Sequence, residues 1–186
     1  MNNQWTDIMV DVETTGTDLR TAAIIQLSAI MFNLSTGEIG PEFDACLRVP
    51  LSDNYIWDTQ TLTWWLRDTN RKSVFEGITA RMEDPRDVIY SFIRWNRVNG
   101  SPTHFWSKPS HFDYNLLSKY FKDYGFENPF KYWKARDMRS YMLGLVFPDP
   151  LPDLRLNSSD AHNALADVRF QINELIKLTK EKRKGL

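Results

Sequence analysis

The sequence has little cysteine and almost no net charge. Its 186 residues include one cysteine, Cys46, which excludes an intramolecular disulfide and a zinc site built from cysteines. A lone thiol fits a reducing compartment, so we expect a cytoplasmic protein. The formal net charge is −1. This near-neutral balance argues against a protein that coats nucleic acid through a strong overall field. It leaves room for a nuclease, because bound metal ions would supply local positive charge.

Long hydrophobic runs are also missing. The longest apolar stretch, residues 22–32, is interrupted by Gln26 and Ser28 and is too short to span a membrane. Residues 1–5 have neither a basic region nor an apolar core of the kind found in signal peptides. We therefore predict no association with a membrane.

The composition is that of a globular α/β protein. Hydrophobic residues make up 42% of the chain and charged residues 25%, and the length suits one domain, predicted at residues 1–180 with a basic tail at 181–186. Strands at the front followed by alternating helices and a strand favour an α/β architecture around a mixed sheet. Strands are predicted at residues 8–13, 22–32, 43–49 and 103–107, and helices at 59–77, 84–99, 110–124, 137–147 and 161–178.

Two acidic residues stand at the end of the first predicted strand. Ile8, Val10 and Val12 alternate with the acids, so Asp11 and Glu13 project together from the opposite face. Two carboxylates this close repel each other unless a cation lies between them. The alternative is a solvated strand face, which is the usual explanation of an isolated D-x-E pattern.

A third acid, Asp113, lies near the start of a predicted helix. Ser110 and Asp113 have the spacing of a capping box, so Asp113 is explained either as a helix cap or as a metal ligand. An acid on the first turn of a helix can serve both roles, because the helix dipole stabilises its charge. The preceding strand places this turn at the carboxyl edge of the sheet, where sites gather in α/β proteins.

His162 and Asp167 lie at the start of the last predicted helix. Residues 158–160 have the composition of a helix cap and would leave His162 at the junction between loop and helix. A histidine in that position can act as a general base, although a lone histidine is more often structural or simply exposed.

Together these segments resemble the DEDD superfamily of 3′→5′ exonucleases. The resemblance rests on the string D-V-E-T-T-G at residues 11–16, on F-D-Y-N-L-L at 112–117, and on H-N-A-L-A-D at 162–167. A histidine five residues before the last aspartate indicates the DEDDh (DnaQ-like) branch, since the sister branch has tyrosine four residues before it and this chain has Asn163. Residues 57–65, 22–27 and 136–139 further resemble the small-exonuclease subgroup of phage DexA and RNase AS.

The resemblance implies a ribonuclease H-like fold with a five-stranded mixed sheet flanked by helices. It implies two Mg²⁺ or Mn²⁺ ions held by Asp11, Glu13, Asp113 and Asp167, with His162 as the base, so activity should rise between about pH 6 and 8. The expected substrate-binding groups are the backbone at Thr14 and Thr15 and the aromatic residues Trp64, Trp106 and Phe112. Core packing is the alternative explanation for the tryptophans.

The implied partner is single-stranded nucleic acid or a 3′ overhang, cut to nucleoside 5′-monophosphates, with DNA slightly favoured. A departure at Gln26, where related branches often carry Glu, bears on how the ribose is recognised. The alternatives are an exoribonuclease acting on RNA 3′ ends and a catalytically silent nucleic-acid-binding module. Relatives often form homodimers, so a homodimer is also predicted.

Overall fold

The computed structural model describes residues 4–147, 149–151, 153, 156 and 161–184. Six strands of this part of the chain form one mixed sheet in the order β4-β3-β2-β1-β5-β6. β1 to β3 make an antiparallel meander, whereas β5 runs parallel to β1, β6 parallel to β5, and β4 parallel to β3. The strands are β1 (Asp7–Thr14), β2 (Ile24–Asn33), β3 (Glu38–Leu47), β4 (Met82–Glu83), β5 (His104–Ser107) and β6 (Ala135–Asp137).

The expected number of five strands is therefore wrong. The two edge strands absent from the sequence prediction, β4 and β6, have two and three residues. Strands this short contain too few residues to show the two-residue alternation by which a strand is recognised. The strand predicted at residues 22–32 is β2, which lies inside the sheet because it pairs with β1 on one side and β3 on the other.

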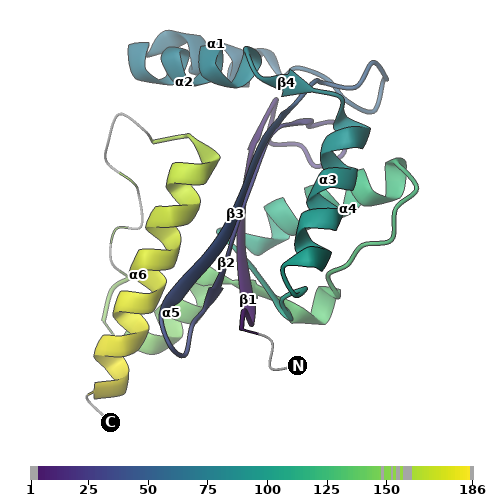
Figure 1. Ribbon diagram of the computed structural model, residues 1–186. Coiled ribbons are helices and arrows are strands. Elements are labelled where there is room, and N and C mark those ends of the chain that lie inside the picture. Colours follow the sequence, from purple (N-terminus) through teal and green to yellow (C-terminus); the bar gives the residue numbers. More distant parts are fainter. Residues whose placement is uncertain (1–3, 148, 152, 154–155, 157–160, 185–186) are drawn as a thin grey trace.

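Helices cover both faces of the sheet and one of its ends (Figure 1). One face carries α3 (Pro85–Val98) and α4 (Ser110–Asp123), and the other carries α5 (Met138–Val146) and α6 (Ala164–Lys184). Across the end of the sheet lie α1 (Thr59–Arg67) and α2 (Thr69–Thr79). A short 3₁₀ helix, η1 (Tyr132–Lys134), precedes β6. Among the described residues, no helix has both the length and the apolar character needed to cross a membrane.

The alternation of β1 divides the core into two layers, as predicted. Ile8, Val10 and Val12 are buried in the layer beneath α3 and α4, while Met9 packs in the layer formed with α5 and α6. Complete burial of such a side chain stabilises the fold by about 1.5–3 kcal/mol. The same alternation places Asp11 and Glu13 on the α6 side, so the core fixes the direction in which these acids point.

Helix ends follow local signals in most places. Asp84 caps α3 with Pro85 in its first turn, Asp137 caps α5 by accepting from the backbone N–H of Ser140, and Gly125 follows α4 with a φ of 74°. The predicted single helix at 59–77 is two helices, because the backbone of Asp68 is extended and its carboxylate caps α2.

Two predictions at helix starts differ from the structure. The side chain of Ser110 makes no capping hydrogen bond, so the predicted capping box with Asp113 is absent and Asp113 is left for another role. The last helix begins at Ala164 rather than residue 161, and Asn163 Oδ1 accepts from the backbone N–H of Ala166. The predicted cap at residues 158–160 lies outside the described residues.

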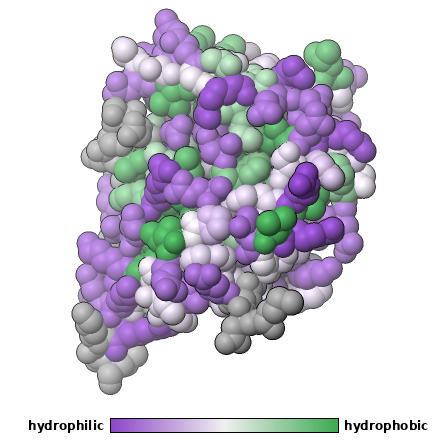
Figure 2. Space-filling model, viewed as in Figure 1, coloured by the Kyte–Doolittle hydropathy of each residue, from purple (hydrophilic) through white to green (hydrophobic). Residues whose placement is uncertain are grey.

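The basic end of the chain continues the last helix. α6 extends through Lys184, so residues 181–184 of the predicted basic tail are helical. Figure 2 shows mainly hydrophilic side chains over this end of the molecule, as expected for the outer turns of a surface helix.

Candidate active site

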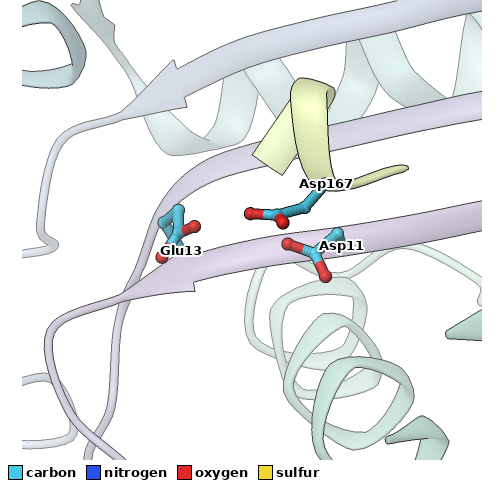
Figure 3. A group of neighbouring side chains, drawn as sticks. All are labelled: Asp11, Glu13 and Asp167. Carbon is cyan, nitrogen blue, oxygen red and sulfur yellow. The ribbon is translucent and has the colours of Figure 1, made fainter. Parts of the chain in front are cut away.

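Three carboxylates meet where β1 ends and α6 begins. Asp11 and Glu13 project from β1 and Asp167 from the first turn of α6, and one oxygen from each lies within 4.8 Å of the others. Figure 3 shows the three side chains directed toward one another. A group of this kind could hold a metal ion, since hard divalent cations bind several carboxylate oxygens at once.

The fourth predicted ligand, Asp113, faces the same cavity from the start of α4. Asp113, His162 and the three clustered acids all line a cavity of about 530 Å³. Asp113 is only 3% exposed, and its Oδ2 atom has no hydrogen-bond partner among the described residues. A buried anionic oxygen without a partner is costly, so a cation in the cavity would satisfy it. The structure thus brings all five predicted catalytic residues to one cavity.

The electrostatics of the site also favour a bound cation. Burial and the neighbouring Asp167 raise the pKa of Asp11 from 3.8 to about 7. Burial, followed by repulsion from Asp11, raises the pKa values of Glu13 and Asp113 well above their ordinary range, and burial raises that of Asp167. Positive charge placed among these groups would restore their ionised forms.

The donor set indicates which class of ion fits. The cluster offers carboxylate oxygens only, which suit hard divalent cations such as Mg²⁺, Mn²⁺ or Ca²⁺ better than soft metals. The orphaned oxygen of Asp113 and the short separation within the cluster meet the requirements of such a site. The residues present therefore fit a divalent cation.

His162 lies on the lead-in to α6, where the sequence predicts it. Its backbone adopts a φ of 69°, and its N–H donates to Asp167 Oδ2 at 3.0 Å. The imidazole meets the Trp64 ring edge-on, with 4.7 Å between ring centroids. Although the residue is exposed, the protein packed against the imidazole lowers its pKa. The neutral form, which can accept a proton, is therefore favoured near neutral pH.

Three of the five predicted substrate contacts line cavities. Phe112 belongs to the cavity that holds the carboxylates, and Thr14 and Trp64 line an adjoining pocket that also includes Glu13. The structure thus leaves these three side chains accessible to a nucleotide next to the acids.

The other two predicted substrate contacts are wrong in this structure. Trp106 is fully buried and its indole N–H donates to Asp7 Oδ1 at 2.7 Å, so neither ring face can stack on a base. Thr15 is fully buried as well. Its hydroxyl bonds Ile56 and Ala23, and its backbone N–H and C=O are engaged by Ala23 and Asp58. Both residues hold the fold together around the site.

Sequence reasoning missed several residues that support the acids. Gln171, one turn beyond Asp167 on α6, donates from Nε2 to Asp11 Oδ1 at 2.9 Å. Lys108 lines the cavity, and its charge offsets part of the rise that burial causes in the pKa values of Asp11 and Asp167. The position of Gln171 four residues after Asp167 is a helical spacing that could have identified it. The sequence gives no comparable signal for Lys108.

Gln26 connects the sheet to the helix that carries Asp167. Its Nε2 donates to Asp44 Oδ1 at 2.8 Å, and its Oε1 accepts from the backbone N–H of Ala164 at 3.1 Å. Ser28 and Arg81 also bond Asp44. The amide at position 26 therefore has both of its polar ends engaged, which a carboxylate would not reproduce, because it cannot donate to Asp44.

Comparison with solved structures defines the fold. The chain is similar to Escherichia coli exonuclease I in complex with single-stranded DNA in its zinc-bound form, with a TM-score of 0.70 and 19% identity over 97% of this chain and 42% of the other. It is also similar to exonuclease I bound to a 5cy-dA13 oligonucleotide, with a TM-score of 0.65 and 18% identity over 94% of this chain and 40% of the other. The fold is therefore the ribonuclease H-like α/β fold of these exonucleases, and the chain spans about two fifths of their length.

A match to a protein-family model shows the family of this chain. Residues 6–178 match the model of the 3′-5′ exoribonuclease Rv2179c-like domain, so the chain belongs to that family. Among curated proteins, no sequence matches significantly. The family match includes all five residues that the structure gathers at the cavity.

Proposed function

We propose that this protein is a metal-dependent 3′→5′ exonuclease of the DEDDh type that removes nucleoside 5′-monophosphates from single-stranded nucleic acid. The observation that carries the proposal is the convergence of Asp11, Glu13, Asp113 and Asp167 with His162 on one cavity. Membership of a 3′-5′ exoribonuclease family supports the same activity.

The four acids would hold two divalent ions, Mg²⁺ or Mn²⁺. When bound, such ions supply positive charge that activates a water and stabilises the departing oxygen of a phosphodiester. Asp11 and Glu13 are fixed in direction by the buried face of β1, and Gln171 holds Asp11 from α6. Asp113 contributes from α4, and Asp167 from α6, so four carboxylates from three elements surround the reacting phosphate.

His162 is proposed as the general base. The neutral imidazole accepts the proton of the attacking water, and the hydrogen bond from the backbone N–H of His162 to Asp167 holds the residue at the edge of the carboxylate cluster. Thr14, Phe112 and Trp64 would contact the terminal nucleotide at the cavity walls. Hydrolysis of the last phosphodiester would leave a shortened strand with a free 3′-hydroxyl.

RNA is the substrate that we propose. The sequence expectation slightly favours DNA, and solved exonuclease I structures contain DNA oligonucleotides, but their identity to this chain is below 20%. The family match spans residues 6–178 and names an exoribonuclease domain, which carries more weight for this chain. A cytoplasmic location, a homodimer and membership of the DexA and RNase AS subgroup stay predictions.

A direct test follows 5′-labelled single-stranded RNA and the matching DNA through a time course with Mn²⁺ and with EDTA. We expect a metal-dependent ladder that shortens from the 3′ end, faster on RNA. A faster ladder on DNA would reverse the choice of substrate. Intact bands with stable binding of the oligonucleotide would favour the silent binding module.

A further inference from the structure

A second groove runs along α1 at the same end of the sheet as the carboxylates. It has a volume of about 460 Å³. Five of its residues lie on one side of α1 and the sixth comes from α2: Thr59, Gln60, Thr63, Trp64, Arg67 and Arg71. Figure 1 shows α1 and α2 lying across the end of the sheet toward which the first turn of α6 points.

Trp64 connects this groove with the candidate active site. Its ring forms part of the groove wall, and it also lines the pocket that contains Glu13 and Thr14. The same ring meets the imidazole of His162 at 4.7 Å. A strand that reaches the carboxylates can therefore continue past Trp64 into the groove without leaving the surface.

The groove has two guanidinium groups available to an anion. Arg67 is exposed and forms no ion pair within the described part of the chain. The guanidinium of Arg71 lies over the Trp64 ring at 4.3 Å. Its Nε is buried without a hydrogen-bond partner among the described residues, while the side chain as a whole is partly exposed and lines the groove. Guanidinium groups bind phosphate oxygens through paired N–H donors, which suits the backbone of a nucleic acid.

Another basic pocket, near α4, is less suited to this role. There Arg20 is paired with Asp18 at 2.7 Å, and the amine of Lys119 donates to the backbone carbonyls of Arg20 and Asn54. That pocket also shares no lining residue with the pocket that contains Glu13 and Thr14, whereas the α1 groove shares Gln60 and Trp64 with it. The α1 groove is the better continuation of the site, because its cations are available and Trp64 joins it to His162.

We propose that the α1 groove binds the phosphate backbone of single-stranded nucleic acid upstream of the nucleotide being removed. This inference rests on the proposed function. The carboxylates repel phosphates wherever metal ions do not lie between them, and the chain has a net charge of −1. The strand beyond the cut therefore needs cations of its own, and Arg67 and Arg71 provide them without reading sequence.

The test measures kcat/KM on a 20-nucleotide strand and on a dinucleotide for wild type, Arg67→Gln, Arg71→Gln and the double variant. A dinucleotide fills the cleavage site and leaves the groove empty. We expect the ratio of kcat/KM on the long strand to that on the dinucleotide to fall about 10-fold in the double variant. The salt dependence of binding should also weaken, by about one unit of slope for each arginine lost. Arg94→Gln, an exposed change on α3, is the matched control.

Several outcomes overturn the inference. An unchanged ratio would show that the groove does not hold the longer strand, and an equal loss on both substrates would place the arginines at the cleaved nucleotide. Arg67→Gln remains informative if Arg71→Gln disturbs Trp64, because Arg67 projects into solvent. Fluorescence anisotropy with a labelled 20-nucleotide strand in Ca²⁺ tests binding separately. If the wild type cleaves neither substrate but its binding still depends on Arg67 and Arg71, the proposed function would be contradicted. The proposal that the groove binds the strand would stand.

Discussion

The backbone N–H of His162 donates a hydrogen bond of 3.0 Å to Oδ2 of Asp167. The backbone of the proposed base, just before α6, is thus hydrogen-bonded to the carboxylate of a proposed metal ligand in the first turn of α6. Because Ala164 is in turn held by Gln26, the position of both groups depends on a polar contact with the sheet. The site is therefore built as one unit across β1, β2 and α6.

Replacing Asp113 with Asn should abolish turnover while preserving the fold. The amide has the same shape but no charge, so it cannot complete the ligand set. We expect kcat/KM to fall by at least about 100-fold, which exceeds the usual effect of losing a residue that only hydrogen-bonds a metal ligand. Circular dichroism and cleavage of labelled RNA measure the two properties. Asp53→Asn, at an exposed position, is the control. A normal rate in Asp113→Asn would contradict the site assignment.

Without metal, the carboxylates should destabilise the protein as pH rises. The pKa of Asp11 is about 7 in the folded protein against an ordinary value of 3.8, so the folded state binds more protons between these values. By linkage, the free energy of unfolding contributed by Asp11 falls as pH rises through this window. Asp11→Asn removes the effect.

In EDTA, the melting temperature of Asp11→Asn should therefore exceed that of wild type by an amount that grows from pH 5 to 8. The difference at pH 8 should reach at least several degrees, since about 2–4 °C corresponds to each kcal/mol. Saturating Mn²⁺ should reverse the order. A difference that stays constant with pH would show that Asp11 titrates normally in the folded protein.

The rate should depend on the protonation of His162. As pH rises through its pKa, the imidazole loses its proton and becomes able to accept one, so kcat rises and then levels. Because the pKa lies below the ordinary value of 6.5, the rise should occur at lower pH than the sequence alone suggests. His162→Gln should lower kcat by about 100-fold or more and remove the rise. His111→Gln, on an exposed histidine outside the cavity, should retain both rate and profile; identical profiles in all three proteins would exclude His162 as the base.

Replacing Gln26 with Glu should lower activity, because Gln26 supports the start of the helix that carries Asp167. A carboxylate at position 26 would face Asp44 without a donor between them, and the repulsion would displace the oxygen that accepts from the backbone N–H of Ala164 at the start of α6. We expect kcat/KM to fall about 10–100-fold, as for other residues that orient ligands. Adding Asp44→Asn supplies the missing donor and should recover part of the activity. Failure of the double variant to recover any activity would count against this contact as the cause.

The sequence predicts the elements that have strong local patterns. The alternation of Ile8, Val10 and Val12 correctly directs Asp11 and Glu13 away from the larger core, and Asp84 and Asp137 cap the predicted helices. The short edge strands β4 and β6 have no comparable pattern, so local sequence does not predict them.

The predictions fail where tertiary packing decides. Trp106 and Thr15 are residue types that suit substrate contacts, yet both are buried by neighbours distant in sequence. Lys108 and Gln26 reach their partners only after the chain has folded, since Gln26 bonds Ala164 across 138 positions. Local spacing contains no information about such contacts.

Calorimetric titration of Mn²⁺ into the metal-free protein tests the central claim most directly, because every proposed role depends on a cation among the four acids. We predict two ions per chain for the wild type and weaker or incomplete binding for Asp113→Asn, with Asp53→Asn unchanged. Heats no larger than dilution for the wild type, under conditions in which the protein is folded, would contradict the account.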